Sequence, residues 1–236
     1  MVQKGGHRKK VAFIVAAVLL SAFGLIALVG GAYVLYLNNG TDSEGYAISQ
    51  PYQVQTSSSA FALWVAPMHI TGVFSWLGNT NIAATKWVVS TSNSGQEVFV
   101  GWAKASDVDS YLGGFSYESP QSWQWHTQPY APKINIPSTT TYNHGSPAVP
   151  PAQERFWTKT ATTTNSTTIY WEPTWNTSEG MNVLVVMNGN GSSGVHANIQ
   201  LGFKVPILGW LPYLLIPLGI VLLALGLLLV KKRKKL

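Results

Sequence analysis

The sequence predicts a membrane protein in which two transmembrane α-helices, one at each end of the chain, flank a mostly antiparallel β-sandwich. Three observations predict this class: a long apolar run near each terminus, a cluster of basic residues beside each run, and short β-rich segments between them. Only 10% of the residues are charged, against about 25% in an ordinary soluble domain. Such a deficit is typical of a chain with membrane segments and a neutral polar surface.

The first apolar run, residues 11–37, follows a basic tail at residues 1–10 and contains no charged residue. It is longer than the about 20 residues that a helix needs to cross a bilayer. It is also longer than the apolar core of about 7–15 residues in a secretory signal peptide. We therefore interpret this run as an uncleaved transmembrane helix.

The second apolar run, residues 206–230, is followed by a basic tail at residues 231–236. Basic clusters next to membrane helices stay on the cytoplasmic side. We therefore expect a protein of the cell membrane with both termini in the cytoplasm, residues 38–205 outside and membrane lipids around its helices. Neither run contains an ionisable residue, which argues against a pore or a transporter.

Small residues recur along both apolar runs, and they are Ala17, Ser21, Gly24, Gly31, Gly219 and Gly226. Small side chains let helix backbones approach closely in lipid. The pattern predicts a helix-packing surface. Two partners are open from the sequence: the chain's own second helix, or another membrane protein or copy of this chain.

The segments predicted to be strands are rich in β-branched and aromatic residues and are bounded by turn residues. They are residues 60–65, 86–92, 97–103, 114–118, 122–126, 155–161, 168–172, 180–188 and 194–203. Turn signals at residues 93–95 and 188–191 predict two hairpins, and residues 155–161 and 168–172 are expected to pair. Strands at this spacing indicate a β-sandwich.

One short helix is expected at residues 107–112, with Ser106 as its N-cap and Gly113 as its stop. The polar residues 39–59 and the Pro-rich residues 129–151 are expected to be loops.

Four ordered stretches in residues 97–230 resemble a known group of proteins. They are VFVGW leading into DVDSYLGG (98–114), PAVPPAQERFW (147–157), TIYWEP (168–173) and VLVVMN before a Gly-rich turn (183–195). The order and spacing resemble uncharacterised two-pass membrane proteins of actinobacterial type with an extracytoplasmic β domain. The function of that group is unknown, so the resemblance implies an architecture and no activity.

The sequence predicts no catalytic residue, no metal site and no cofactor. The absence of Cys excludes disulfides and thiolate metal sites. Asp107 and Asp109 are two positions apart on the expected helix and would not face each other. The residues between the apolar runs are more acidic than basic, which argues against nucleic acid as a partner.

Tryptophan is the most unusual residue, with 10 copies. Trp123 and Trp125 are two apart and would share one face of a strand. Two interpretations are open: packing in the core, or a flat platform that contacts surface glycans. Four Asn residues begin Asn-x-Ser/Thr triplets and are candidate N-glycosylation sites, namely Asn39, Asn165, Asn176 and Asn190.

We therefore expect a non-enzymatic accessory or structural subunit of a membrane assembly at the cell surface. It would act through helix packing and its outer β domain. The alternative is a membrane-anchored module that binds glycans or cell wall.

The predicted topology can be tested with tags in intact cells. A tag at either terminus should be inaccessible from outside, whereas a tag at Asn165 should be accessible, because the basic tails hold both ends in the cytoplasm. An accessible C-terminus would contradict the two-pass topology.

Overall fold

The computed structural model describes residues 4–66, 84–93, 95–126, 133–143, 145, 149–171 and 180–233. The chain divides into two compact units. One contains Met1–Thr41 and Pro206–Leu236, and the other is Asp42–Val205. Each unit is described by itself.

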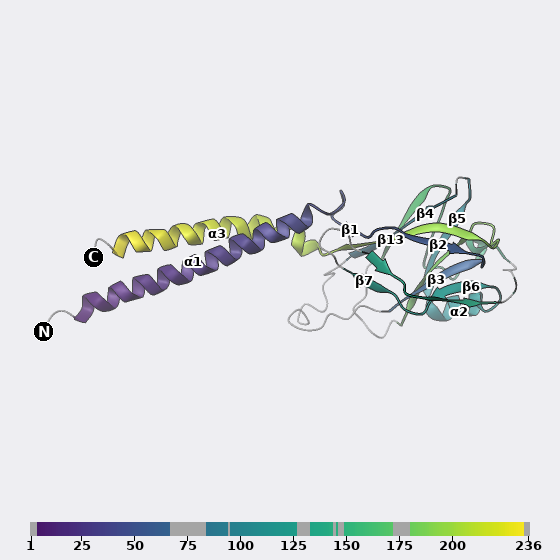
Figure 1. Cartoon of the computed structure of the whole chain (residues 1–236), viewed down its shortest axis with the longest axis horizontal. Coiled ribbons are helices and arrows are strands. Elements are labelled where there is room, and N and C mark those ends of the chain that lie inside the picture. Colours follow the sequence, from purple (N-terminus) through teal and green to yellow (C-terminus); the bar gives the residue numbers. More distant parts are fainter. Residues whose placement is uncertain are drawn as a thin grey trace. The chain divides into compact units, whose positions relative to one another are not determined.

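The first unit is a pair of helices, α1 (Lys4–Asn38) and α3 (Pro206–Arg233). Their segments Val11–Asn38 and Pro206–Lys232 are long and apolar enough to cross a membrane. The two helices lie side by side and antiparallel, with both chain ends at the same end of the pair (Figure 1). The two long apolar helices predicted from the sequence are thus present in the structure.

The small residues of the two helices face each other. A Cβ added at Gly24 would lie 2.9 Å from the carbonyl oxygen of Gly219, so the two backbones are nearly in contact. A Cβ at Gly226 would lie 2.5 Å from Ser21 Oγ and 3.2 Å from the Ala17 carbonyl oxygen.

At Gly31, the same addition would meet Ile216 Cγ1 at 2.8 Å. Of the two packing partners left open by the sequence, the structure therefore has the chain's own second helix. The other faces of both helices carry exposed large apolar side chains, among them Val18, Phe23, Ile26, Val29, Ile220 and Leu227.

The second unit consists mainly of two β-sheets. The first sheet has the order β1–β13–β4–β11, and β2 also pairs with β13. Its strands are β1 (Ala47–Ile48), β2 (Tyr52–Thr56), β4 (Ala84–Thr91), β11 (Ser166–Trp171) and β13 (Val195–Lys204).

The second sheet has the order β10–β5–β12–β3–β6–β9. Its strands are β3 (Ala60–Val65), β5 (Val98–Lys104), β6 (Tyr117–Pro120), β9 (Thr139–Tyr142), β10 (Lys159–Thr163) and β12 (Asn182–Asn188). A separate small sheet pairs β7 (Gln124–His126) with β8 (Lys133–Asn135). Among the described strand pairs only β3 and β6 run parallel, so the predicted, mostly antiparallel β domain is confirmed.

The main core lies between the two sheets, where side chains such as Trp87, Val89, Leu184 and Val186 pack together. The opposite face of the second sheet is also covered. The helix α2 (Ala105–Leu112) packs Val108 and Leu112 against that face, beside the 3-10 helix η2 (Pro151–Gln153). Because β12 is covered on both faces, residues 183–188 are buried without alternation, which explains their continuous apolar sequence.

The predicted hairpins are wrong, because the strands on either side of each turn belong to different sheets. β4, β11 and β13 lie in the first sheet, whereas β5, β10 and β12 lie in the second. Each turn therefore carries the chain across the core. Turn residues specify that a chain reverses direction, but they do not specify whether the two flanking strands pair or face each other.

A buried asparagine joins the turns at this crossing end of the domain. Asn188 is only 3% exposed. Its Oδ1 accepts a hydrogen bond from Gln96 Nε2, and its Nδ2 donates to the carbonyl oxygens of Ser192 (3.0 Å) and Ser193 (3.1 Å). The side chain thereby links the β4–β5 turn to the β12–β13 turn. A backbone hydrogen bond from Gly194 N to the Ser58 carbonyl (3.0 Å) adds the β2–β3 turn.

The short helix also differs from the prediction. It begins one residue before Ser106, and its N-cap is Lys104, which makes no side-chain capping hydrogen bond. β5 runs directly into α2, and the first N–H, that of Ala105, donates to the Met181 carbonyl (2.9 Å) of the chain segment that leads into β12. A tertiary partner thus replaces the predicted cap. The helix ends at Leu112, before Gly113, as predicted.

The two predicted loops contain strands. Residues 39–59 include β1 and β2, and residues 129–151 include β8 and β9. β1 and β2 pair with β13, which lies far along the chain, so local composition does not reveal them.

Replacing Asn188 with Ala should destabilise the β domain by about 1–3 kcal/mol, because buried partners lose their hydrogen bonds. Chemical unfolding of the full-length protein in detergent, followed by tryptophan fluorescence, measures this change. Ser193→Ala is the matched control, since the Ser193 side chain is exposed, and it should shift stability by less than about 0.5 kcal/mol. Equal effects of both substitutions would contradict the role assigned to Asn188.

Candidate functional site

A cavity of about 530 Å³ lies at the end of the sandwich opposite the crossing turns. Its lining residues come from the beginnings of β4 and β12, the ends of β5 and β11, the start of β10 and the loop before β1: Tyr46, Ala84, Thr85, Trp102, Lys104, Thr158, Lys159, Tyr170, Trp171 and Asn182. Ligand sites in proteins are typically cavities of about 300–1,000 Å³. This cavity is therefore large enough for a small organic ligand.

Strand register places aromatic rings in this cavity. Trp102 lies on β5 and Trp171 on β11, in facing sheets, and their ring centroids are 4.8 Å apart. Both indoles are largely buried and join the core. The rings of Tyr46 and Tyr170 are 6.3 Å apart, and Tyr170 is 44% exposed. The cavity thus combines a buried aromatic pair with a more accessible tyrosine.

Polar groups complete the lining. Thr85 Oγ1 donates a hydrogen bond to the Trp171 carbonyl (2.7 Å), while Thr158 and Asn182 add a hydroxyl and an amide. Lys104 pairs in register with Asn182, and Lys159 with Trp102, so both lysines are placed at the cavity by the second sheet. Both lysines are exposed.

The loop of residues 42–46 supplies one wall of the cavity. Asp42 Oδ1 accepts hydrogen bonds from the backbone N–H groups of Glu44 (3.0 Å) and Tyr46 (2.9 Å). Gly45 has a φ of +82°, a value that side-chain-bearing residues rarely adopt. This tight turn brings the Tyr46 ring to the sheet.

A buried lysine attaches this loop to the first sheet. We call Lys86, Asp42, Glu44, Tyr46 and Tyr170 the Lys86 cluster. Lys86 is 6% exposed, and its Nζ lies 2.6 Å from Asp42 Oδ2 and 2.5 Å from Glu44 Oε2. The same Nζ lies 4.6 Å from the centroid of the Tyr46 ring, and the Tyr170 hydroxyl donates to Glu44 Oε1 (2.9 Å). The cluster therefore fixes two tyrosines that line the cavity.

Gly202 makes room for Lys86. It pairs with Lys86 across the β13–β4 ladder and with Ile48 across the β1–β13 ladder. A Cβ at Gly202 would lie 2.7 Å from Ile48 Cδ1 and 2.8 Å from Lys86 Cγ. The missing side chain lets the aliphatic part of Lys86 lie over β13.

Charge pairing shifts the pKa values in this cluster. Burial alone would raise the pKa of Asp42, but hydrogen bonds from Lys86 and from two backbone N–H groups lower it below the usual 3.8. Hydrogen bonds from Lys86 and then Tyr170 lower the pKa of Glu44 below 4.5. Burial would lower the pKa of Lys86, but hydrogen bonds with both carboxylates raise it above 10.5.

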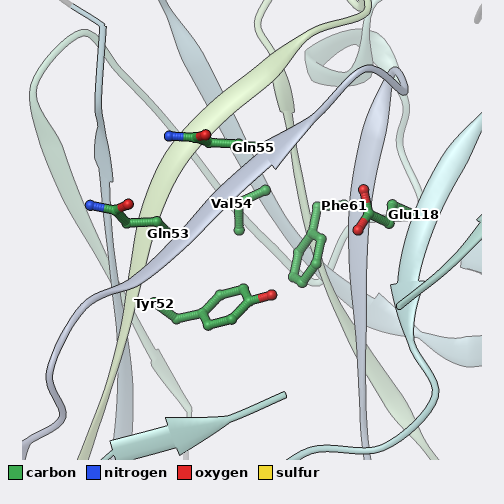
Figure 2. Close-up of a pocket in the computed structure, with 6 residues that line it drawn as sticks. All are labelled: Tyr52, Gln53, Val54, Gln55, Phe61 and Glu118. Atoms are coloured by element: carbon green, nitrogen blue, oxygen red, sulfur yellow. The ribbon is translucent and has the colours of Figure 1, made fainter. Parts of the chain in front are cut away.

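A second cavity of about 150 Å³ lies between β2, β3 and β6 (Figure 2). The Tyr52 ring points toward Phe61 and Glu118, whereas the side chains of Gln53 and Gln55 point away from them. Burial, and to a lesser extent the charge of Glu118, raises the pKa of Tyr52. This cavity is below the usual size of a ligand site, so the larger cavity is the better candidate.

The predicted glycan-contact residue Trp123 is partly buried against the core. Its Nε1 donates to the Trp64 carbonyl (2.9 Å), and its ring lies edge-on to Trp87 with centroids 6.1 Å apart. Trp123 therefore covers the edge of β3. The side chain of Trp125 lies outside the described part of the structure.

One aromatic surface has no signal in the sequence. Tyr117 and Tyr142 are cross-strand partners on β6 and β9, and their rings stack with centroids 4.5 Å apart and an interplanar angle of 11°. Trp64 lies 6.0 Å from Tyr117. The three rings form a row on the face of the second sheet that carries α2. Only the pairing of β3, β6 and β9 brings them together.

Three of the predicted N-glycosylation sites are described. Asn39 follows α1 and is exposed, and Asn165 and Asn190 are exposed in the turns β10–β11 and β12–β13. Those two turns lie at the end of the domain away from the larger cavity. Asn176 lies outside the described residues. Within the described residues, no three His, Asp or Glu side chains come together as a metal site.

No protein-family model matches the chain, and no curated protein matches it. Among solved structures, the chain is similar to CorA, a surface-associated copper-binding protein important in copper acquisition by Methylomicrobium album BG8. The identity is 12%, the alignment covers 70% of this chain and 96% of CorA, and the TM-score is 0.29. That similarity is too slight to assign a shared fold, and the copper binding of CorA is not carried over to this chain.

Lys86→Met should destabilise the β domain at pH 7 by about 1–3 kcal/mol, because it removes hydrogen bonds to two carboxylates. Since the folded-state pKa values of Asp42 and Glu44 are lowered, their contribution is complete above pH 4.5 and is lost as the pH falls through the folded values. Thermal unfolding measured between pH 7 and pH 3 should show the difference between wild type and variant shrinking. A difference that is constant over this range would contradict the ion pairs as its cause.

Proposed function

We propose that this protein is a membrane-anchored, non-enzymatic binding module whose β domain takes a carbohydrate into the cavity lined by Tyr46, Tyr170 and the Trp102–Trp171 pair. The observation that carries this proposal is the composition of the cavity. It combines aromatic rings with hydroxyl, amide and ammonium groups from six parts of the chain.

Sugar binding needs this combination. The C–H face of a pyranose ring packs on a flat aromatic side chain, and its hydroxyl groups need hydrogen-bond donors and acceptors. Tyr170 offers an accessible ring, while Thr158 and Asn182 offer polar groups. The exposed ammonium groups of Lys104 and Lys159 add hydrogen-bond donors for sugar hydroxyl groups.

The anchor is the helix pair. Both helices are long and apolar enough to span a bilayer, and each has a basic tail in the sequence. The positive-inside rule supports cytoplasmic tails and an extracytoplasmic β domain at the cell membrane. In that topology the cavity faces the compartment in which cell-surface glycans are found.

The second candidate function is an accessory or structural subunit of a membrane assembly. In that function, another membrane protein would pack against the exposed apolar faces of α1 and α3, which include Phe23 and Leu227. The small residues lend it little support, because they pack between α1 and α3 of this chain. Isolation in mild detergent tests it: a partner that remains bound in stoichiometric amount favours the subunit.

Full-length protein in lipid nanodiscs should bind a subset of an array of neutral, uronic-acid-containing and phosphorylated oligosaccharides. Tyr170→Ala should weaken that binding at least about tenfold, because it removes the exposed aromatic ring on which the sugar would pack. The readout is array signal against protein concentration.

Tyr142→Ala is the matched control, because Tyr142 is 42% exposed but lies in the other aromatic group. It should leave binding unchanged. If Tyr142→Ala abolishes binding and Tyr170→Ala does not, the cavity is not the site. If the folded wild type binds no oligosaccharide, the carbohydrate proposal fails.

A further inference from the structure

The basic residues described in the β domain differ in whether the protein itself already pairs them. They are Lys86, Lys104, Lys133, Arg155, Lys159 and Lys204. Lys86 is held by Asp42 and Glu44, and Lys204 Nζ donates to the Glu44 carbonyl (2.6 Å). Both of these lysines therefore hold the loop of residues 42–46. Two of the other four basic residues, Lys104 and Lys159, line the proposed carbohydrate-binding cavity.

Among the described residues that line the cavity, none is acidic. The nearest carboxylate in the described residues that contacts a lining side chain is Glu44, which accepts from the Tyr170 hydroxyl. Glu44 is already paired with Lys86. Basic side chains thus outnumber acidic ones among the described lining residues, whereas acidic residues outnumber basic ones in the sequence between the apolar runs.

We propose that the cavity recognises an acidic sugar, whose carboxylate or phosphate group is bound by Lys104 and Lys159 while its ring packs against Tyr170. This inference rests on the proposed carbohydrate binding and names the ligand class. Lys159 Nζ donates to the backbone carbonyl of Tyr170, which ties this lysine of the second sheet to β11 of the first sheet.

The two lysines approach the cavity from different strands. Lys104 is at the end of β5, and Lys159 is at the start of β10, the neighbouring strand. Trp102, the register partner of Lys159, lies two residues before Lys104 on β5 and also lines the cavity. Because cross-strand partners and alternate residues of a strand share a face of the sheet, Lys104, Lys159 and Trp102 lie on the same face of the second sheet. Hydrogen bonds between charged partners are roughly twice as strong as those between neutral ones, so the acid group would determine selectivity.

The test compares matched neutral and acidic oligosaccharides on the array with full-length protein in nanodiscs: galactose trimers, galacturonate trimers and a phosphorylated hexose. The wild type should bind an acidic probe at least about tenfold more tightly than its neutral counterpart. Raising the salt concentration should reduce the preference. Galacturonate and phosphorylated hexose distinguish a carboxylate from a phosphate as the recognised group.

The double variant Lys104→Gln/Lys159→Gln should lose the preference while retaining weak binding of the neutral trimer. Lys133→Gln, a lysine on β8 that does not line the cavity, should retain the preference. Circular dichroism checks that the variants are folded.

Equal binding of neutral and acidic probes would overturn the acidic-sugar inference and leave carbohydrate binding standing. A preference that survives the double variant would also overturn it. Absence of binding to every array component would overturn both the inference and the proposed function.

Discussion

The β domain depends on one constraint: successive long strands cross from one sheet to the other. β2 is followed by β3, β4 by β5, β10 by β11 and β12 by β13, and in each case the two strands lie in different sheets. The strands on either side of these turns therefore pair with strands elsewhere in the chain and not with each other. Pairing between strands that are far apart in the sequence costs the chain conformational entropy, because a long loop must close before the stabilising contacts can form. The Asn188 hydrogen bonds and the Gly194–Ser58 bond join the crossing turns and hold this arrangement at one end.

The two ends of the β domain differ in structure: one end holds the turns that cross between the sheets, and the other end holds the cavity. The crossing turns are tied to one another by backbone and amide hydrogen bonds and carry the exposed Asn165 and Asn190. At the other end, strand termini and the loop of residues 42–46 surround a space that the core side chains do not fill. The Lys86 cluster keeps that loop against the sheet by charge pairing. The Lys86 side chain is buried, whereas the Glu44 side chain is 46% exposed, so water is excluded from the lysine side of these pairs but reaches the Glu44 carboxylate.

The candidate site was only partly accessible from the sequence. The abundance of tryptophan indicates aromatic contacts, and the spacing of Trp123 and Trp125 predicts two rings on one face of a strand, in the core or as a glycan platform. Trp123 packs on the core beside Trp87. The cavity draws Trp102 and Trp171 from strands in facing sheets, and Tyr46 from a turn whose position depends on Lys86. No short-range pattern could have selected them, because their proximity follows from strand register.

By itself, the sequence determined the two long apolar helices, the mostly antiparallel domain between them and the short helix before Gly113. These features follow from local properties: hydrophobic length, β-forming composition and glycine. Only the tertiary structure decided which strands pair, which small residues contact each other in α1 and α3, and which rings line the cavity. The physical reason is that a turn residue fixes the direction of the chain within a few bonds. The sheet to which a strand belongs is decided instead by partners far away in the sequence, through buried area and hydrogen bonds that form only when the whole domain has folded.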